Sequence, residues 1–246
     1  MENILLPTHF TIEPTDKPNV ATLVLEPCYF GYGTTVGNAL RRVLLSSLSG
    51  AAVTAIKIKG ATHEFQAVDN VKEDVLQIIL NLKNLRLKLF SDQPVKLRLR
   101  VKGAATVTAA DFEANADVEI VNPELVIATT TDAKADFDLE AVVERSRGYS
   151  STEERKEKSD ELGMIAIDAL FSPVRNVGYR VENTRVGDVT NFDKLVMTIE
   201  TDGTIDPKDA VEQSTKILLD YFNLLISAPA EIVEAPAETA EEPVVE

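Results

Sequence analysis

Alternating apolar and polar positions predict strands along most of the chain. THFTIE (8–13) and VATLVLE (20–26) alternate like strands with one buried face, and the turn-rich PTDKPN between them favours a hairpin. VTAIKIKG (53–60) continues the pattern, and the segment from about 85 to 148 alternates between turn residues. Later strands are expected at GMIAIDAL, NVGYRVEN and KLVMTIET. The long middle segment therefore predicts a second, mainly antiparallel domain.

Helical spacing of apolar residues appears three times. The first helix follows PCYFGYG, the second lies in VKEDVLQIILNLKNL, and the third is the last ordered element. Each is bounded by residues that start or stop helices. These signals are Thr34 or Thr35 with Ser49-Gly50 for the first helix, an Asn70–Glu73 capping box for the second, and Asp206-Pro207 with Ser227 for the third.

Two segments lack the pattern of a packed structure. SSTEERKEKSDE (150–161) is charged and rich in serine, with no apolar face, and is expected to be a mobile surface loop. Residues 228–246 contain proline, alanine and six glutamates but no base, no aromatic residue and no periodic apolar face. That composition predicts an acidic, disordered linker.

The composition is that of a soluble globular protein. Of 246 residues, 44% are hydrophobic and 26% charged, and no apolar run approaches the roughly 20 residues of a membrane span. The start, MENILLPTHF, lacks the basic and long apolar parts of a secretion signal, so a cytoplasmic location is expected. One cysteine and two distant histidines cannot form an internal disulfide or a zinc or iron–sulfur site, and no cofactor is expected.

The acidic balance argues against direct nucleic-acid binding. The formal net charge is −15, whereas domains that grip a phosphate backbone carry a basic balance. Six of the negative charges lie in the tail. Any contact of this chain with DNA or RNA is therefore expected to be indirect.

Candidate catalytic and anion-binding residues are few. Gly31, Gly33 and Gly37 lie at the start of a helix, where backbone N–H groups can cradle an anion, but they match neither a dinucleotide fingerprint nor a Walker loop. Tight packing or turn geometry is the favoured explanation for them. His9 and His63 are most simply surface or strand residues. No catalytic residue is predicted on this chain.

The first helix has two distinct faces when it is turned through about 100° per residue. An apolar face is expected to point towards the core and consists of Val36, Leu40, Val43 and Leu44. The opposite side carries two arginines beside an apolar residue and consists of Asn38, Arg41, Arg42 and Leu45. That side is either a second protein-binding surface, since arginine and leucine together suit a desolvated anchor, or a set of ordinary exposed side chains.

The last helix carries an apolar seam with spacings of four, three, four and three residues. Its members are Val211, Thr215, Leu218, Phe222 and Leu225. Such spacing is typical of a helix packed along another helix. A second stripe widens the apolar face and consists of Ile217, Tyr221 and Ile226. The helix therefore either packs on its own sheet and on a symmetry mate, or is a terminal core helix.

Several ordered blocks of the sequence resemble the α subunits of bacterial DNA-directed RNA polymerases. The family's helix motif reads approximately RGFGxTLGNALRRxLLSS, and this chain has FGYGTTVGNALRRVLLSS. The resemblance continues through HEF (63–65), VKEDVLQIILNLKNL, DVEIVNPELVIAT and AIDALFSPVRNVGYRVENTRVGDVTNFDKLVMTIETDGTIDPKDAV. These blocks cover most of residues 20–225 in the family's order. By this resemblance the chain is identified as a member of the family.

The resemblance implies an α+β fold and a scaffold function. Residues 1–50 and 172–227 should form an α/β dimerisation domain, residues 51–171 an inserted, mostly antiparallel β domain, and residues 228–246 the linker. In the family, two copies pair through the first and last helices, and the dimer nucleates assembly by receiving the β and β′ subunits. The chain is accordingly expected to be a homodimeric subunit of a nucleotidyltransferase without an active site of its own.

The resemblance also assigns surface roles to individual residues. The β-subunit contact is expected at Asn38, Arg41, Arg42, Leu45, His63 and Glu64, and the β′ contact at Lys83. The dimer interface is expected at Val36, Leu40, Val43, Leu44, Val211, Leu218, Phe222 and Leu225.

Three departures from the family's pattern limit what can be transferred. Phe30 stands where the family commonly has arginine, and SRGYSSTEERKEKSDELG replaces the usual RGYVPA-type loop. The family's carboxy-terminal DNA-binding module does not follow the tail, so the chain is expected to end within its linker. The residues alone leave two other functions open, namely a freestanding dimeric regulator that binds proteins and an enzyme that binds an anion at Gly31, Gly33 and Gly37.

Overall fold

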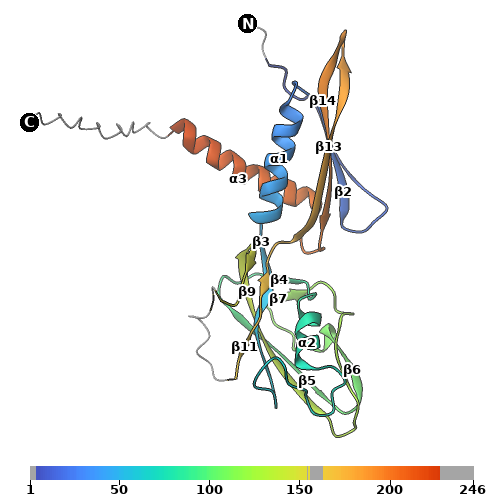
Figure 1. Cartoon of the computed structure of the whole chain (residues 1–246), viewed down its shortest axis with the longest axis vertical. Coiled ribbons are helices and arrows are strands. Elements are labelled where there is room, and N and C mark those ends of the chain that lie inside the picture. Colours follow the sequence, from blue (N-terminus) through green and yellow to red (C-terminus); the bar gives the residue numbers. More distant parts are fainter. Residues whose placement is uncertain (1–3, 154, 156–162, 228–246) are drawn as a thin grey trace, which may run out of the picture.

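The computed structural model of the chain shows two bodies stacked along its longest axis (Figure 1). It describes residues 4–153, 155 and 163–227. The first body contains the start and the end of the chain, and the middle of the chain forms the second. The predicted linker at 228–246 lies outside the described residues, as does most of the predicted loop at 150–161.

An antiparallel sheet of four strands forms the framework of the first body. Its order is β1-β2-β14-β13, so strands from the two ends of the chain meet at its centre. β13 and β14 pair over almost their whole length and extend beyond the other strands as a long hairpin (Figure 1). The strands span His9–Pro14 (β1), Val20–Cys28 (β2), Val174–Val186 (β13) and Val189–Thr201 (β14).

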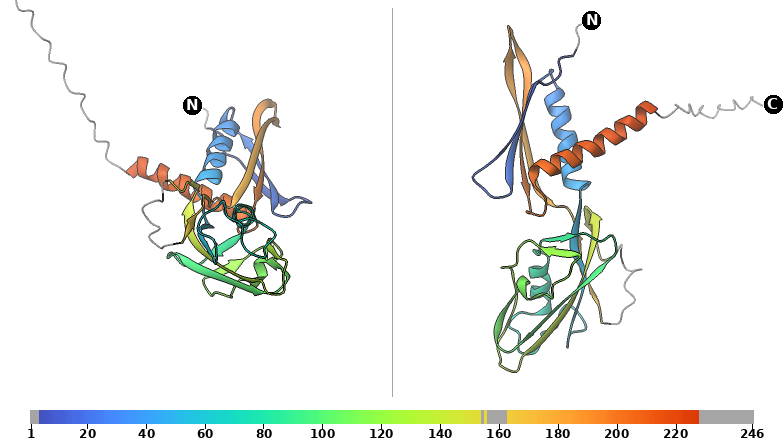
Figure 2. Two further views of the ribbon diagram at one scale, coloured as in Figure 1. Left: turned by 60° about the horizontal axis from the view of Figure 1, so that its bottom comes forward. Right: turned by 180° about the vertical axis from the view of Figure 1, so that it is seen from behind.

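Two helices cover one face of this sheet and cross each other (Figure 2). α1 spans Tyr32–Ser46 and α3 spans Pro207–Ser227. As predicted, Asp206 caps the start of α3, where its carboxylate accepts the N–H of Lys208 at 2.8 Å. Sheet and helices share one core, whose buried members include Leu23, Leu40, Leu44, Val177, Met197 and Ala210.

The second body is built on an antiparallel sheet of six strands. The order is β5-β9-β3-β4-β7, and β11 also pairs with β3. Helix α2, Val75–Leu82, buries one face in the same core as the sheet residues Ile56 and Leu139. The strands span Ser49–Ile58 (β3), Leu87–Leu89 (β4), Val95–Lys102 (β5), Val118–Ile120 (β7), Asp136–Arg147 (β9) and Ile165–Ala166 (β11).

Two short antiparallel pairs and one 3-10 turn complete the second body. β6 (Ala105–Thr108) pairs with β8 (Val126–Thr130), β10 (Tyr149–Ser150) pairs with β12 (Ala169–Leu170), and the 3-10 turn η1 spans Ala109–Asp111. The single strand predicted in GMIAIDAL is wrong, because β11 and β12 are separate strands with different partners. All the ladders of both sheets are antiparallel, and the predicted α+β class is confirmed.

The first helix begins and ends earlier than the sequence predicts. Its N-cap is Gly31, whose φ of 82° is left-handed and unstrained for glycine, and no side chain caps the helix locally. Thr35 instead donates its hydroxyl to the carbonyl of Gly31 at 3.3 Å. The C-cap is Ser47, and Gly50 already belongs to β3. The predicted threonine cap and the predicted stop at Ser49-Gly50 are therefore wrong.

The second helix begins later than predicted. Its N-cap is Asp74, whose carboxylate accepts the N–H of Gln77 at 2.7 Å. The predicted Asn70–Glu73 capping box is wrong, because Glu73 accepts hydrogen bonds from the N–H and the hydroxyl of Thr129 on β8. Glu73 thus connects the segment that precedes α2 to β8 by hydrogen bonds and does not cap the helix.

Two segments cross closely where the bodies meet. A Cβ atom placed on Gly50, at the start of β3, would lie 1.9 Å from the carbonyl oxygen of Phe171. The N–H of Phe171 donates to the carbonyl of Gly148 at 2.8 Å, which fixes the returning segment beside the end of β9. Glycine is therefore needed at position 50 for close backbone approach.

Candidate dimer and subunit interfaces

Helix α1 begins close to its sheet because two glycines form the first part of its inner face. A Cβ atom on Gly33 would lie 2.9 Å from the Cβ of Asp193, and one on Gly37 would lie 2.8 Å from side-chain atoms of Leu195 and Tyr179. Four residues of a helix rise about 6 Å, and two residues of a strand, whose side chains point to the same face, span about 6.8 Å. Because these two spacings are similar, Gly33 and Gly37 of α1 can each lie against one of the same-face residues Asp193 and Leu195 of β14. The glycines at 33 and 37 therefore serve tight packing.

The start of α1 is occupied by a carboxylate of the chain itself. The N–H of Gly33 donates to Oδ2 of Asp193 at 3.1 Å, and Asp193 is 6% exposed. Burial, and secondly the nearby Asp193 carboxylate, raise the pKa of the Cys28 thiol above its usual value. An external anion would compete with Asp193 for this helix terminus, so the geometry gives no support to anion binding at the glycines.

An apolar groove runs between α1, α3 and the first two strands. It has a volume of about 450 Å³ and is lined almost entirely by carbon atoms. Phe10 of β1 and Phe222 of α3 both line it, and each is 56% exposed. Of the predicted dimer residues, Val36, Leu40, Val211, Leu218 and Phe222 line this groove.

The remaining predicted dimer residues lie elsewhere. Leu44 is fully buried in the core of its own chain, so it supports α1 from within and has no surface left for a partner. Val43 is half-buried on the side of α1 and is not part of that core. Leu225 is exposed near the end of α3.

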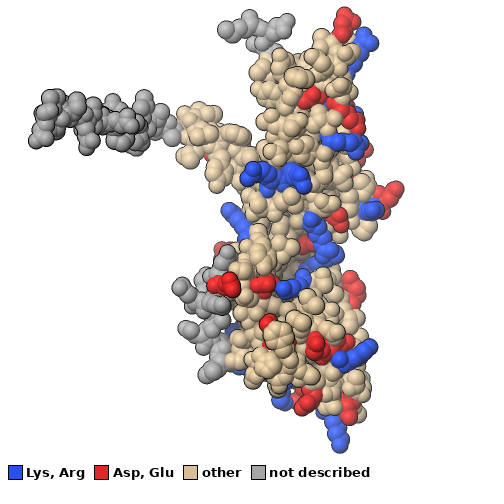
Figure 3. Space-filling model, viewed as in Figure 1, with Lys and Arg blue, Asp and Glu red and all other residues tan. Residues whose placement is uncertain are grey.

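The second half of α3 projects from the body and is apolar (Figures 1 and 2). The helix buries Pro207, Ala210, Val211 and Ser214 in its first two turns. Its last turns expose large apolar side chains, up to 83% for Ile226. This projecting end is almost free of charged side chains (Figure 3). The exposed residues are Leu219, Tyr221, Phe222, Leu224, Leu225 and Ile226.

The outward side of α1 carries two arginines without partners. Arg41 and Arg42 are exposed, and neither guanidinium makes a hydrogen bond or ion pair with any residue that the structure describes. Asn38 is exposed on the same side, whereas Leu45 is half-buried and packs against the core. Leu45 is therefore not the fully outward residue that the helical wheel predicts. Basic side chains gather at the level where α1 and α3 cross (Figure 3).

The residues assigned to the β contact fall on two separate patches. His63 is exposed and Glu64 half-buried, in the segment that follows β3. β3 has ten residues, which span about 30 Å, and it leads away from α1 into the second body. A partner that touches both Arg42 and His63 must therefore extend along the whole of β3.

Lys83, assigned to the β′ contact, already has a partner within the chain. Its ammonium lies 3.8 Å from a carboxylate oxygen of Asp168, and both side chains are more than one-third exposed. The backbone N–H of Thr152 and, more weakly, Lys83 hold the pKa of Asp168 below its usual range. The pair is weak at this distance and exposure, so an incoming carboxylate could take over Lys83.

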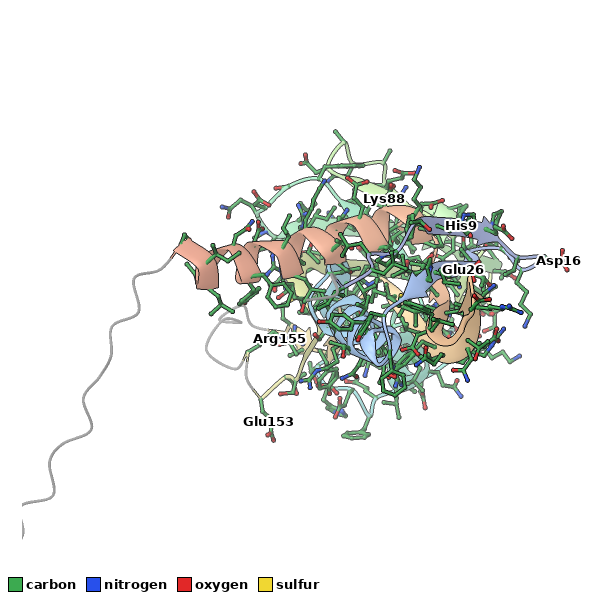
Figure 4. All side chains as sticks on the ribbon, turned by 90° about the horizontal axis from the view of Figure 1, so that it is seen from above. His9, Asp16, Glu26, Lys88, Glu153 and Arg155 are labelled. Atoms are coloured by element: carbon green, nitrogen blue, oxygen red, sulfur yellow. The ribbon has the colours of Figure 1, made fainter. Side chains whose placement is uncertain are left out.

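The histidines do not form a catalytic pair. His9 is exposed on β1 opposite Glu26 of β2, where the two lie on neighbouring strands (Figure 4). Glu26 in turn lies 3.1 Å from the ammonium of Lys194. His63 belongs to the other body.

The two arginines of β5 are neutralised by the neighbouring strand. Arg98 and Arg100 both donate hydrogen bonds to the carboxylate of Asp138 on β9. The distance to Oδ2 is 3.0 Å from Nη2 of Arg98 and also 3.0 Å from Nε of Arg100. Hydrogen bonding from Arg98, and also from Arg100, lowers the pKa of Asp138, so its charge persists at neutral pH. Arg98 and Arg100 are therefore not free to bind a phosphate backbone.

Membrane-spanning and metal-binding arrangements are not seen in the part of the chain that the structure covers. None of the described helices has the length and apolar character needed to cross a bilayer. Among the described residues, no three His, Cys, Asp or Glu side chains converge as ligands for a metal ion.

Comparison with known proteins identifies the family. Residues 56–172 match the family model described as the RNA polymerase Rpb3/RpoA insert domain. Over 241 residues, which are 96% of this chain and 76% of the relative, the sequence is 46% identical to a DNA-directed RNA polymerase subunit alpha of Oceanobacillus iheyensis. The chain belongs to the bacterial RNA polymerase α-subunit family. A second α subunit, from Bacillus velezensis, is 45% identical over the same shares of the two chains.

Family membership makes the chain a scaffold subunit of a DNA-directed RNA polymerase, a nucleotidyltransferase in which α itself is non-catalytic. It also defines the second body as the insert domain of that family. The α-subunit family thus accounts for a protein whose most distinctive features are surfaces rather than an active site.

Three residues at these surfaces are not among the predicted site residues. Phe10 and Leu219 line the groove beside the predicted residues. The alternation of β1 is a usable signal for Phe10, because Phe10 and Ile12 share one face of the strand and Ile12 packs on the core. Asp193 has no such signal, since its partner Gly33 is 160 residues away in the sequence.

Proposed function

We propose that two copies of this chain form the α dimer of an RNA polymerase, and that the dimer holds the β and β′ subunits on surfaces outside the dimer interface. The observation that carries the dimer is the projecting half of α3, whose large apolar side chains are 55–83% exposed within the described chain. Burying such a surface is favourable at about 25 cal/mol per Å² of apolar area.

The apolar groove supplies a matching acceptor on the same molecule. Across a two-fold axis, the apolar end of α3 in each protomer can pack into the apolar groove of the other protomer. Because both pairs of surfaces are then used, the assembly closes at two copies. Phe222 belongs to both features, since it lines the groove and begins the exposed half of α3. Cytoplasmic location follows from the proposed role in transcription.

The unpaired arginines of α1 support a subunit contact on the opposite side of the helix. Two exposed guanidiniums without acceptors can pair with carboxylates or carbonyls of a partner, and arginine is enriched at energetically dominant interface positions. The assignment of this side to β, with Asn38, Arg41, Arg42 and the separate patch at His63 and Glu64, rests on the resemblance to the family. The assignment of Lys83 to β′ rests on the same resemblance.

The experiment is capture of the cognate β subunit by the Arg42→Ala protein. Arg42 is exposed and unpaired, so the substitution should leave the fold and the dimer intact. Loss of an arginine anchor should weaken the affinity for β at least about tenfold, measured by titration of labelled β.

Arg175→Ala is the matched control, because Arg175 is likewise exposed but belongs to β13 and not to α1. It should bind β like the unsubstituted chain. Equal affinity of the Arg42→Ala protein and the control would contradict the assignment of α1 to the β contact.

A further inference from the structure

Helix α1 lacks the usual means of satisfying its first turn. Its N-cap is a glycine with no side chain, its first turn contains no acidic residue, and no local side chain accepts from it. The first N–H groups of a helix need acceptors, and the positive end of the helix dipole favours a nearby negative charge. The N–H of Tyr32 has a local acceptor in the carbonyl of Tyr29 at 2.9 Å. A side-chain acceptor for the following N–H groups of the first turn must come from elsewhere in the fold.

Asp193 is placed to be that acceptor. It pairs across the sheet with Cys28, and the register of β14 on β2 shifts between Asp193 and Leu195. Such a shift re-aims side chains locally. The Asp193 carboxylate accepts the N–H of Gly33 at 3.1 Å, and a Cβ on Gly33 would approach the Cβ of Asp193 to 2.9 Å. Only glycine at position 33 leaves room for this contact.

The buried charge of Asp193 has no cation to neutralise it. Asp193 is 6% exposed, and the described part of the chain provides no ion pair for it, because the adjacent Lys194 pairs with Glu26 at 3.1 Å. A buried carboxylate without compensation is strongly disfavoured. The N-terminus of α1 is thus the group that stabilises the buried carboxylate of Asp193. The same interaction holds the N-terminus of the helix in place.

We infer that Asp193 is a positioning residue for the subunit interfaces: as a remote N-cap it fixes α1 on the sheet, and thereby sets where the β-binding arginines and the groove residues of α1 lie. The effect on β binding rests on the proposed function. The hydrogen bond between Asp193 and Gly33 does not depend on any partner.

The need for a fixed point follows from the way α1 packs. The first part of its inner face contains Gly33 and Gly37, which approach the sheet without side chains that interlock with it, and buried side chains on this face begin only at Leu40 and Leu44. Arg42 lies nine residues beyond Gly33, which is about 14 Å along the helix. A tilt of about 10° at the terminus would displace Arg42 by roughly 2 Å, enough to break a hydrogen-bonded contact. The capping bond, together with the buried Leu40 and Leu44, therefore determines the position of a surface two to three turns away.

The first test is amide hydrogen exchange of Gly33 in the full-length dimer, followed by NMR. An N–H in the first turn of a helix normally exchanges rapidly, but the bond to Asp193 should protect Gly33. In the Asp193→Ala protein the exchange of this amide should be about tenfold faster or more. In the Asp193→Asn protein, which keeps an acceptor oxygen but loses the charge, the effect should be intermediate.

Glu200→Ala is the matched control, since Glu200 is an exposed acid on the same strand and the substitution removes the same charge. It should leave the Gly33 amide protected. Rapid exchange of Gly33 in the unsubstituted protein, or equal exchange in all four proteins, would overturn the cap.

The second test measures the affinity for β with the same proteins. Asp193→Ala should weaken β binding several-fold, Asp193→Asn should restore part of it, and Glu200→Ala should have no effect. Unchanged β affinity of Asp193→Ala would overturn the positioning role. If the proposed function is wrong, the Arg42→Ala protein will bind β as tightly as the unsubstituted chain. The amide exchange of Gly33 would still show whether Asp193 caps the helix, so the two failures can be distinguished.

Discussion

At the scale of single residues, three glycines mark places where the chain approaches itself closely. Gly33 and Gly37 let α1 lie against β14 and β13, and Gly50 lets two segments cross between the bodies. In each case the neighbouring atom that excludes a side chain comes from a segment more than 100 residues away in the sequence. Local sequence therefore marks the glycines but cannot name their partners.

Replacement of Gly50 by alanine should destabilise the chain by about 3 kcal/mol or more, because the added methyl would clash with a backbone carbonyl that cannot rotate away. The measurement is urea unfolding of the protein. Gly178→Ala is the control, since a Cβ on Gly178 meets nothing within 4 Å and its backbone is not left-handed. A Gly50→Ala protein as stable as Gly178→Ala would contradict the close crossing.

The residue scale is also where sequence interpretation is least complete. Tight packing or turn geometry is the favoured role of the glycines at the start of α1. The close contacts of Gly33 and Gly37 and the left-handed φ of Gly31 confirm it. The threonine cap of α1 is wrong because the acceptor for the first turn is Asp193, on a strand formed much later in the chain. No local spacing of residue types contains that information.

At the scale of elements, α3 divides into two halves with different surroundings. The predicted seam begins in the core, where Val211 is buried and Leu218 packs partly against the sheet and α1. It continues into the projecting half, where Phe222 and Leu225 are exposed. The periodicity predicts one continuous apolar face. Only the tertiary structure shows at which residue this face leaves the core of its own chain and becomes exposed.

Phe222→Asp should convert the dimer into monomers, because dimerisation would then bury an unpaired carboxylate at a cost of several kcal/mol. Phe222 suits this test better than Leu218, since it is 56% exposed and contributes little to the core of its own chain. Sedimentation velocity measures the result. Asn223→Asp is the control, because it adds the same charge at an exposed neighbouring position outside the groove and should remain dimeric. A dimeric Phe222→Asp protein would show that α3 is not in the interface.

At the scale of the whole molecule, two bodies separate the tasks of the chain. The first body carries the groove, the projecting helix and the unpaired arginines, while the second carries His63, Glu64 and Lys83. The alternation of strands and the ordered family blocks predict this α+β organisation from the sequence. The separation of Arg42 and His63 by the length of β3 could not be predicted, because it depends on the direction in which β3 leaves α1.

The most direct measurement of the scaffold role is the stoichiometry of the assembled complex. Native mass spectrometry of this chain mixed with its cognate β and β′ subunits should give an assembly containing two copies of the 26.9 kDa chain, one β and one β′. The chain alone should appear at twice its monomer mass. A stable assembly of β and β′ with a single copy of this chain would contradict the proposed dimeric scaffold.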